Sequence, residues 1–367
     1  MNEFKFNGHR LQFARKRRGL AAKEVADSLK VTTRTFSNYE NEQRDPGEKI
    51  IGELSKLLEF PTSFFYLDDI VSLNPDCVSF RSLARMSAKV RDKALCSAQI
   101  ALEFSSWLDS RFELPEPILP HLQDLTPEAA AEALRNEWSI GTQPVNNIIH
   151  LLESKGVKIF SLDEETDDMD GFSFWQDSTP FIFLNTQKSM ERSRFDAAHE
   201  LGHLILHKHG SPKGKEVESE ANRFASAFLM PEAAILSYSR TFITLNWIFQ
   251  AKKFWRVSAT ALIRRLRDIE LLTEWNYRTM VIQLSKNGYS KKEPNPIQER
   301  EFSKLFPMIF SALKAEHVDK QKIADNFCVY PNELDKLLFN LTLTQIYGRG
   351  ESSTSKANTS NHLRLVE

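Results

Sequence analysis

The sequence predicts a mainly α-helical protein with one small β-sheet, an α+β fold with helical units at both ends. The chain has 367 residues, which at roughly 150 residues per domain allows two or three domains. It is 41% hydrophobic and 26% charged, the composition of an ordinary folded protein, and its net charge of −1 excludes no class of partner. Hydrophobic residues follow a helical period over most of the chain and alternate with period two only between residues 157 and 184.

Residues 1–70 are short amphipathic segments that predict a bundle of five helices. Two of them, Ala22 to Leu29 and Thr32 to about Glu40, are separated by a turn at residues 30–31, a helix-turn-helix layout. Nine Lys and Arg residues between Lys5 and Arg34, against two acidic residues, leave a local excess of seven positive charges. This density predicts binding to the phosphates of double-stranded DNA, and the alternative is a solvated basic face.

The second helix of this layout is predicted to enter the major groove with Phe36 and Tyr39 facing inward. Its outward side chains carry hydroxyl, guanidinium and amide groups, which pair with base edges and phosphates. The residues predicted to contact DNA are Arg15, Thr33, Arg34, Ser37 and Asn38.

These positions resemble the XRE-type (Cro/repressor-like) helix-turn-helix family over about 60 residues. The residues that carry the resemblance are Leu11, Arg15, Gly19, Leu20, Val25, Ala26, Leu29, Val31, the run from Thr35 to Glu40, and Pro46. The resemblance implies an operator-binding domain. The family usually begins the first motif helix with Ser or Thr followed by Gln, which cap the helix and touch the DNA backbone. This chain has Ala21 and Ala22 there, which predicts lower affinity but the same fold.

Residues 71–135 are predicted to form a helical connector, with one long helix from Ser87 to Phe112 and a second that starts at Thr126 and Pro127. The alternating runs at 157–160, 171–175 and 180–184 predict the small sheet of a central domain over residues 136–285. Between the first two runs lies an acidic stretch, Asp163 to Asp170. It is either a solvated loop or a binding surface for a basic substrate.

The run from His199 to His203 reads His-Glu-Leu-Gly-His, the strongest chemical signal in the chain. In a helix the two His lie on one face about one turn apart and can bind one Zn²⁺, with Glu200 placed to act on a metal-bound water. The alternatives are a chance occurrence and a buried structural pair of His.

A zinc site of this kind needs a third protein ligand. His209 stands where one metallopeptidase class has its third His, but that class has Gly where this chain has Leu206, so the helix is expected to carry His209 away. On the next predicted helix Glu218 lies roughly 50° from the centre of the apolar stripe and Glu220 roughly 110°. We therefore predict Glu218 as the ligand, with Glu220 as its rival, and Asn222 as a hydrogen-bond partner that orients a ligand His.

A His-Glu-x-x-His helix followed by a Glu on the next helix is the gluzincin arrangement. The runs from Arg194 to His207 and from Glu218 to Pro231 resemble the ImmA/IrrE family of metallopeptidases, and the likeness extends from about Ser79 to Leu272. The resemblance implies a cytoplasmic regulator of a stress response or a mobile genetic element, which cleaves an XRE-type repressor after a stress or DNA-damage cue. Single-stranded DNA is one candidate for that cue.

A Lys- and Pro-rich linker, Ser290 to Pro296, separates the central domain from a predicted C-terminal helical domain at 297–347 and a disordered tail at 348–367. The C-terminal helices have helix-turn-helix-like spacing but a less basic surface, which favours packing or homodimer formation over DNA binding. The three cysteines are irregularly spaced and no apolar run approaches the ~20 residues that span a bilayer, which predicts a cytoplasmic protein without a membrane partner.

Together these features predict a DNA-binding transcriptional regulator that carries a zinc-dependent endopeptidase. Its substrate would be an XRE-type repressor, either a separate protein or its own N-terminal domain. The alternative is a DNA-binding repressor in which the zinc site is structural or senses a signal.

Overall fold

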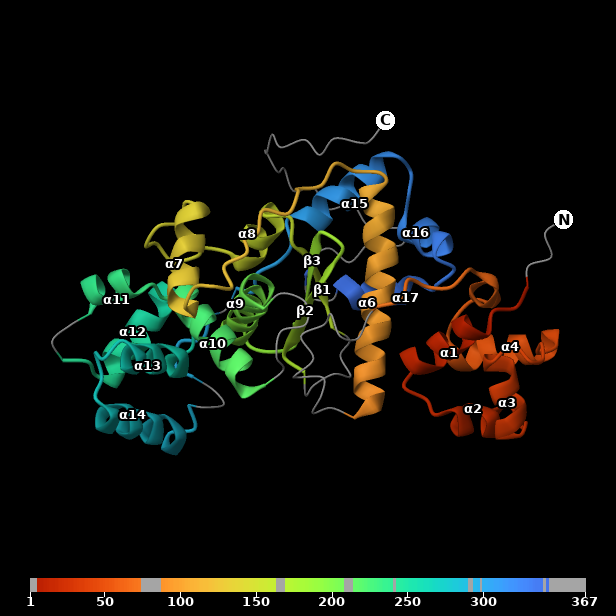
Figure 1. Ribbon diagram of the computed structural model, residues 1–367, viewed down its shortest axis with the longest axis horizontal. Helices are drawn as coiled ribbons and strands as arrows, with labels where there is room; N and C mark the ends of the chain where they lie inside the picture. Colours follow the sequence, from red (N-terminus) through yellow and green to blue (C-terminus); the bar gives the residue numbers. More distant parts are fainter. Residues whose placement is uncertain are drawn as a thin grey trace.

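The computed structural model describes residues 5–73, 87–162, 169–207, 214–239, 242–289, 293–297, 299–338 and 341–342. They form a mostly helical protein with one three-stranded sheet near its middle, which confirms the predicted fold class (Figure 1). Within these ranges, no helix is both long and apolar enough to cross a membrane.

The N-terminal bundle has the five helices that the sequence predicts. They are α1 Gly8–Arg17, α2 Ala22–Ser28, α3 Thr33–Glu40, α4 Glu48–Leu58 and the 3-10 helix η1 Thr62–Tyr66. Thr32 caps α3 by accepting a hydrogen bond from the Thr35 amide at 3.1 Å. At the start of α2, where Ala21 offers no capping oxygen, the Ala21 amide donates instead to the Glu24 carboxylate at 2.6 Å.

One long helix, α6 (Ala88–Asp109), runs beside this bundle and connects it to the sheet (Figure 1). Its buried residues belong to the same hydrophobic core as those of α1, and Arg10 of α1 donates to Glu103 of α6 at 2.9 Å. The helix predicted as a connector therefore packs against both units that it joins.

The three strands are β1 Lys158–Ser161, β2 Gly171–Gln176 and β3 Thr179–Leu184, in the order β1-β3-β2. Strand β3 is central, parallel to β1 and antiparallel to β2, so one edge of β2 has no strand partner among the described residues. Alternation sorts the side chains by face: Phe181 and Phe183 of β3 pack toward α6, whereas Ile182 and Leu184 join the core on the other side.

The remaining helices divide between two hydrophobic cores, one on each side of the sheet. Those on the face of Ile182 are α7 Pro127–Glu137, α8 Ile148–Ser154, α9 Met190–Leu206, α10 Lys215–Leu229, α11 Glu232–Tyr238, α12 Leu245–Trp255, α13 Ala259–Asp268 and α14 Glu274–Lys286. Those on the phenylalanine face, besides α6, are α15 Leu305–Ala315, α16 Lys320–Asn326 and α17 Pro331–Leu338.

The C-terminal segment bridges the two cores through buried carboxylates. Glu301 pairs with Arg194 of α9 and accepts from the Ile148 amide at 2.9 Å. Glu333 of α17 accepts from Arg17 at 2.9 Å and from Arg18 at 2.6 Å, and the side chains of Glu333 and Arg17 are both 0% exposed. This helix is thus packed against α1 rather than presented as a second DNA-binding helix.

We predict that Glu333→Gln destabilises the protein by about 3–5 kcal/mol at pH 7, because it removes the buried carboxylate charge that faces the buried Arg17 guanidinium. Burial alone raises the pKa of Glu333, but Arg17 and Arg18 outweigh burial and hold this pKa at about 2. The stabilisation is therefore complete above the ordinary glutamate pKa and is lost as the pH falls from about 4.5 toward 2. Urea unfolding at pH 7 and pH 3 should show a smaller difference between the variant and the wild type at pH 3.

Asp335→Asn is the matched control, because Asp335 lies on the same helix but is 49% exposed, in an ion pair with Lys320. We expect a change below about 1 kcal/mol. An unfolding midpoint for Glu333→Gln equal to that of this control would contradict the prediction.

Candidate metal centre and DNA-binding helix

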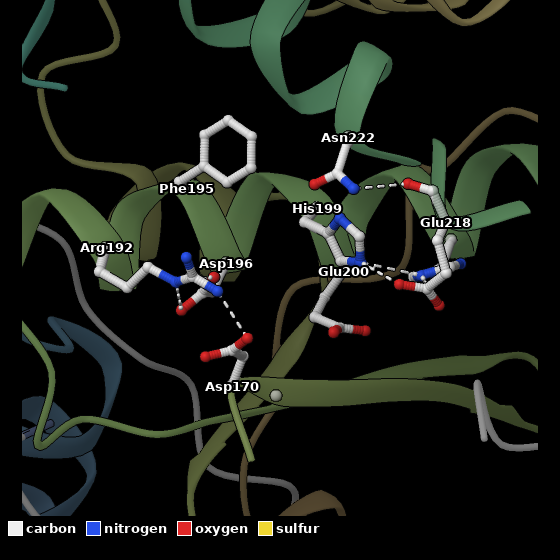
Figure 2. A pocket seen from close by; sticks show the side chains of 10 residues that line it. Asp170, Arg192, Phe195, Asp196, His199, Glu200, Glu218 and Asn222 are labelled. Carbon is white, nitrogen blue, oxygen red and sulfur yellow. Dashed lines mark hydrogen bonds and ion pairs between the residues drawn. The ribbon is translucent and has the colours of Figure 1, made fainter. Parts of the chain in front are cut away.

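Helix α9 places His199 and His203 on one face, four residues apart. The helix starts at its N-cap Ser189, whose hydroxyl accepts from the Arg192 amide at 3.3 Å, and ends at Leu206. Its opposite faces are buried by the sheet and by α10, which leaves the two imidazoles directed into a cavity of about 160 Å³ (Figure 2).

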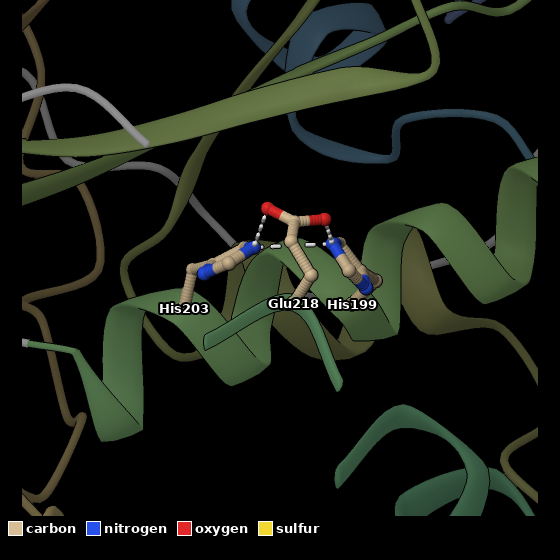
Figure 3. A group of neighbouring side chains, drawn as sticks. All are labelled: His199, His203 and Glu218. Atoms are coloured by element: carbon tan, nitrogen blue, oxygen red, sulfur yellow. Dashed lines mark hydrogen bonds and ion pairs between the residues drawn. The ribbon is translucent and has the colours of Figure 1, made fainter. Parts of the chain in front are cut away.

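Close packing of α10 against α9 brings in the third donor. A Cβ atom added to Gly202 would lie 3.0 Å from the Phe224 ring and 3.3 Å from the Cα of Ala221, so only glycine fits without displacing α10. Because α10 lies this near, Glu218 in its first turn reaches across to the two His (Figure 3).

The three donor atoms have the spacing of a metal site. The Glu218 carboxylate lies 3.6 Å from His199 Nε2 through one oxygen and 3.6 Å from His203 Nε2 through the other. The two Nε2 atoms are 3.1 Å apart. Donors placed around a tetrahedral zinc ion at its usual bond lengths lie about 3.4 Å apart. Two imidazoles and one carboxylate, all within 4.8 Å of one another, therefore fit Zn²⁺ in both spacing and chemistry.

Burial keeps both imidazoles in the neutral form that binds a metal. It lowers the pKa of His199 to about 4, against the opposing effect of a hydrogen bond with Asn222. Burial also lowers the pKa of His203 well below its ordinary value, and the neighbouring His199 and His207 add to the shift. Asn222 donates to the Glu218 carbonyl at 2.8 Å, so it lies between two of the three donors, where the sequence predicted an orienting residue.

Glu200 lies beside these donors and is held from the sheet. Its carboxylate accepts from the Ser173 hydroxyl of β2 at 2.7 Å, and its side chain packs over Gly171, where an added Cβ would be 3.4 Å from the carboxylate. Figure 2 shows Glu200 next to His199 and Glu218. The carboxylate lines the same cavity as the two His. Its position next to the donor set suits a base that acts on a water molecule there.

A second charged cluster lines the other end of this cavity. Arg192 donates to Asp170 at 2.5 Å and lies 3.0 Å from Asp196, and Lys188 also pairs with Asp170 (Figure 2). Burial raises the pKa of Asp196 to about 7, although Arg192 opposes the shift. Asp170 is thus part of the cavity wall, whereas residues 163–168 of the predicted acidic loop fall outside the described residues.

The two residues that the sequence offered as alternatives to Glu218 for the third ligand, Glu220 and His209, are not among the three donors described here. Glu220 accepts from His207 at 2.9 Å and does not join the three donors. His209 falls outside the described residues, and α9 continues through Leu206 as the sequence predicted.

The predicted DNA-contact residues of α3 share one side of the helix, away from Phe36 and Tyr39, which are buried. Thr33 and Arg34 are exposed, and Ser37 and Asn38 are half-buried. In Figure 1, α2 and α3 lie at the end of the molecule opposite α11 to α14.

Many of the basic residues between Lys5 and Arg34 form ion pairs with acidic residues of the same protein. Arg15 donates to both oxygens of Glu40 and to the Leu20 carbonyl, which joins α1 to α3 and leaves it 14% exposed. The other basic residues of this segment in ion pairs are Lys5, Arg10, Arg17 and Arg18. The predicted DNA contact at Arg15 would require the Arg15–Glu40 ion pair to break. The exposed basic residues of this segment that could contact phosphates are Lys23, Lys30 and Arg34.

Sequence reasoning missed three residues of the site, Ser173, Arg192 and Asp196, whereas the spacing of His207, four residues beyond His203, predicts a residue that packs beside the ligands or supports one of them. Ser173 had a signal, because it is the one polar side chain in the run from Gly171 to Trp175, at a position that faces α9. Arg192 and Asp196 lie on α9 itself, seven and three residues before His199, but nothing in their spacing specifies a partner.

Comparisons with known proteins agree with these two sites. Residues 152–267 match the M78 peptidase family model, described as IrrE N-terminal-like domain, and residues 11–65 match a helix-turn-helix family model. The chain is also 37% identical over 65 residues to the HTH-type transcriptional regulator ImmR of Bacillus subtilis (strain 168). This alignment covers 18% of the chain and 51% of the relative, so the chain spans about half the length of the curated relative it matches.

These matches confirm both resemblances that the sequence suggested. The chain carries an XRE-type helix-turn-helix segment at 11–65 and an IrrE/ImmA-like peptidase-family segment at 152–267. All four residues of the candidate metal centre, His199, Glu200, His203 and Glu218, lie inside the second segment.

We predict that Gly171→Ala destabilises the protein by about 1–3 kcal/mol, because the added Cβ would lie 2.8 Å from the Phe183 carbonyl oxygen and must displace backbone. The same methyl group presses on Glu200. Chemical unfolding of the purified variant measures the effect. Gly52→Ala is the control: nothing lies within 4 Å of its Cβ inside α4, so it should stabilise by up to about 1 kcal/mol. Equal unfolding free energies for the two variants would refute this account of Gly171.

Proposed function

We propose that this chain, which joins an XRE-type helix-turn-helix to an IrrE/ImmA-like peptidase segment, is a transcriptional regulator that binds operator DNA and acts as a zinc-dependent endopeptidase. The observation that carries the peptidase half is the donor set of His199, His203 and Glu218 with Glu200 beside it in one cavity. A purely structural zinc site commonly uses four protein ligands, whereas a catalytic site has three and leaves one position for water or substrate.

His199, His203 and Glu218 would hold the ion. A bound zinc ion supplies a Lewis acid that polarises the peptide carbonyl and lowers the pKa of water. Glu200 accepts the proton of the attacking water and then returns it to the leaving amine. Ser173 donates its hydroxyl to the Glu200 carboxylate at 2.7 Å and so holds this side chain at the cavity.

The proposed substrate is an XRE-type repressor, a separate protein or the N-terminal domain of another copy of this chain. Within one copy that domain is held by buried contacts, Arg17 with Glu333 and Arg10 with Glu103. These contacts favour cleavage in trans, because a domain held against α6 and α17 is not free to enter the cavity near α9.

We predict that Glu200→Gln lowers the rate of cleavage by about 10²- to 10⁴-fold while zinc still binds. The experiment incubates the zinc-loaded chain with an XRE-type repressor, with and without single-stranded DNA, and identifies fragments by mass spectrometry. Glu216→Gln is the matched control, because Glu216 is an exposed carboxylate on α10 outside the donor set.

Undiminished cleavage by Glu200→Gln would rule out the proposed role of Glu200. A wild-type chain that binds zinc but cleaves neither the repressor nor itself, with or without single-stranded DNA, would favour a repressor whose zinc site is structural or senses a signal.

We predict that Arg34→Ala and Asn38→Ala each weaken operator binding by about 1–3 kcal/mol, because each removes a hydrogen-bonding group from the exposed side of α3. The probe is the duplex that the wild-type chain selects from a random pool, measured at fixed salt. Arg278→Ala is the control, since Arg278 on α14 is 70% exposed and far from α3. Operator affinities equal to that of Arg278→Ala would show that α3 is not the reading helix.

A further inference from the structure

A third histidine of α9 lies behind the metal ligand His203. His207 follows His203 by four residues and is the C-cap of α9, where the backbone leaves the helical conformation with φ −118° and ψ 82°. In a continued helix its ring would be rotated further around the axis. Because the helix ends here, the ring turns back so that its Nδ1 lies 3.0 Å from Nδ1 of His203.

The other nitrogen of His207 reaches α10. Its Nε2 lies 2.9 Å from a carboxylate oxygen of Glu220, and the His207 side chain is only 10% exposed. Glu220 is 37% exposed and stands two residues after the ligand Glu218. Three side chains thus form a chain of hydrogen bonds from α10 to the metal centre.

The carboxylate of Glu220 determines which atom donates in each of these hydrogen bonds. An ionised carboxylate only accepts, so His207 must carry its proton on Nε2 and donate it to Glu220. In a neutral His207 the other ring nitrogen, Nδ1, is then an acceptor, so His203 carries its own proton on Nδ1. This leaves the lone pair of His203 on Nε2, the atom that faces His199 and Glu218. The carboxylate of Glu220 therefore selects the tautomer that can bind a metal.

We infer that His207 and Glu220 are positioning residues for the metal ligand His203, holding its ring and its tautomer through two consecutive hydrogen bonds. The inference rests on the proposed zinc site. His199 is held differently, by Asn222, so each of the two ligand imidazoles has its own partner. Partners of this kind typically change metal affinity by about 10- to 100-fold when removed.

Zinc affinity of the full chain, measured by competition with a chromophoric chelator, tests the inference without using cleavage. His207→Phe keeps a ring of similar size but removes the acceptor for His203, and we expect affinity to fall by about 10- to 100-fold. Glu220→Ala should cause a smaller loss, because water can replace a carboxylate that is 37% exposed. The ligand-field absorption of the Co²⁺-loaded chain should change in both variants.

Glu216→Ala is the matched control, because it removes an equal charge from the preceding turn of α10, and the carboxylate in contact with His207 is that of Glu220. It should bind zinc as the wild type does. His207→Phe with the affinity and Co²⁺ spectrum of this control would overturn the inference.

If His207→Phe does not fold, a second pair of variants tests the same inference. His207→Gln offers an amide oxygen to His203 and an amide hydrogen to Glu220, so it should bind zinc more tightly than His207→Ala. Equal affinities for these two would also overturn the inference. A wild-type chain without zinc affinity, or Glu218→Ala with undiminished affinity, would instead contradict the proposed metal site.

Discussion

The close approach of α10 to α9 is the constraint on which the metal centre depends. It is set at Gly202, where the absence of a side chain lets Ala221 and Phe224 pack against the helix that carries both His. Glu218 lies one turn before this contact, so its reach to the imidazoles follows from the helix separation. The buried groups Arg135 and Arg265, which donate to the carbonyls of Phe228 and Met230, hold the far end of α10. The donor set is therefore a product of core packing and not of a mobile loop.

The sheet separates the side of the molecule that holds the candidate metal centre from the side that carries the helix-turn-helix domain. Its phenylalanine face shares one core with α6 and the N-terminal bundle, and its other face supports α9. The C-terminal segment contacts both sides, through Glu301 at Arg194 and through Glu333 at Arg17. Arg194 is five residues before His199, so one segment touches both the metal helix and the first helix of the DNA-binding domain. A displacement of this segment would change the contacts of both α9 and α1.

Sequence reasoning reached the parts of the site that follow from local periodicity. The pairing of His199 with His203 depends only on helical spacing, and Glu218 follows from its angle to the apolar stripe of α10. Ser173 was not assigned a role, because its contact with Glu200 depends on how β2 lies across α9, which spacing along the chain does not determine. The basic excess between Lys5 and Arg34 indicates a DNA-binding segment but overestimates the charge that is available to phosphates, because a charge count does not reveal that Arg17 pairs with a residue more than 300 positions away. Long-range partners decide which charges face solvent.

Two acidic residues near the start of α10 contact different His side chains: Glu218 lies with His199 and His203, and Glu220 contacts His207. Glu218 and Glu220 are two residues apart, so on an ideal helix their directions differ by roughly 160° around the axis. Both nevertheless interact with His of α9, because His207 lies past the end of that helix and its ring lies on the far side of His203. Glu216 and Glu218 also lie in the first turn, where the helix dipole favours negative charge. The end of α9 at Leu206 is thus what brings His207 into contact with both His203 and Glu220.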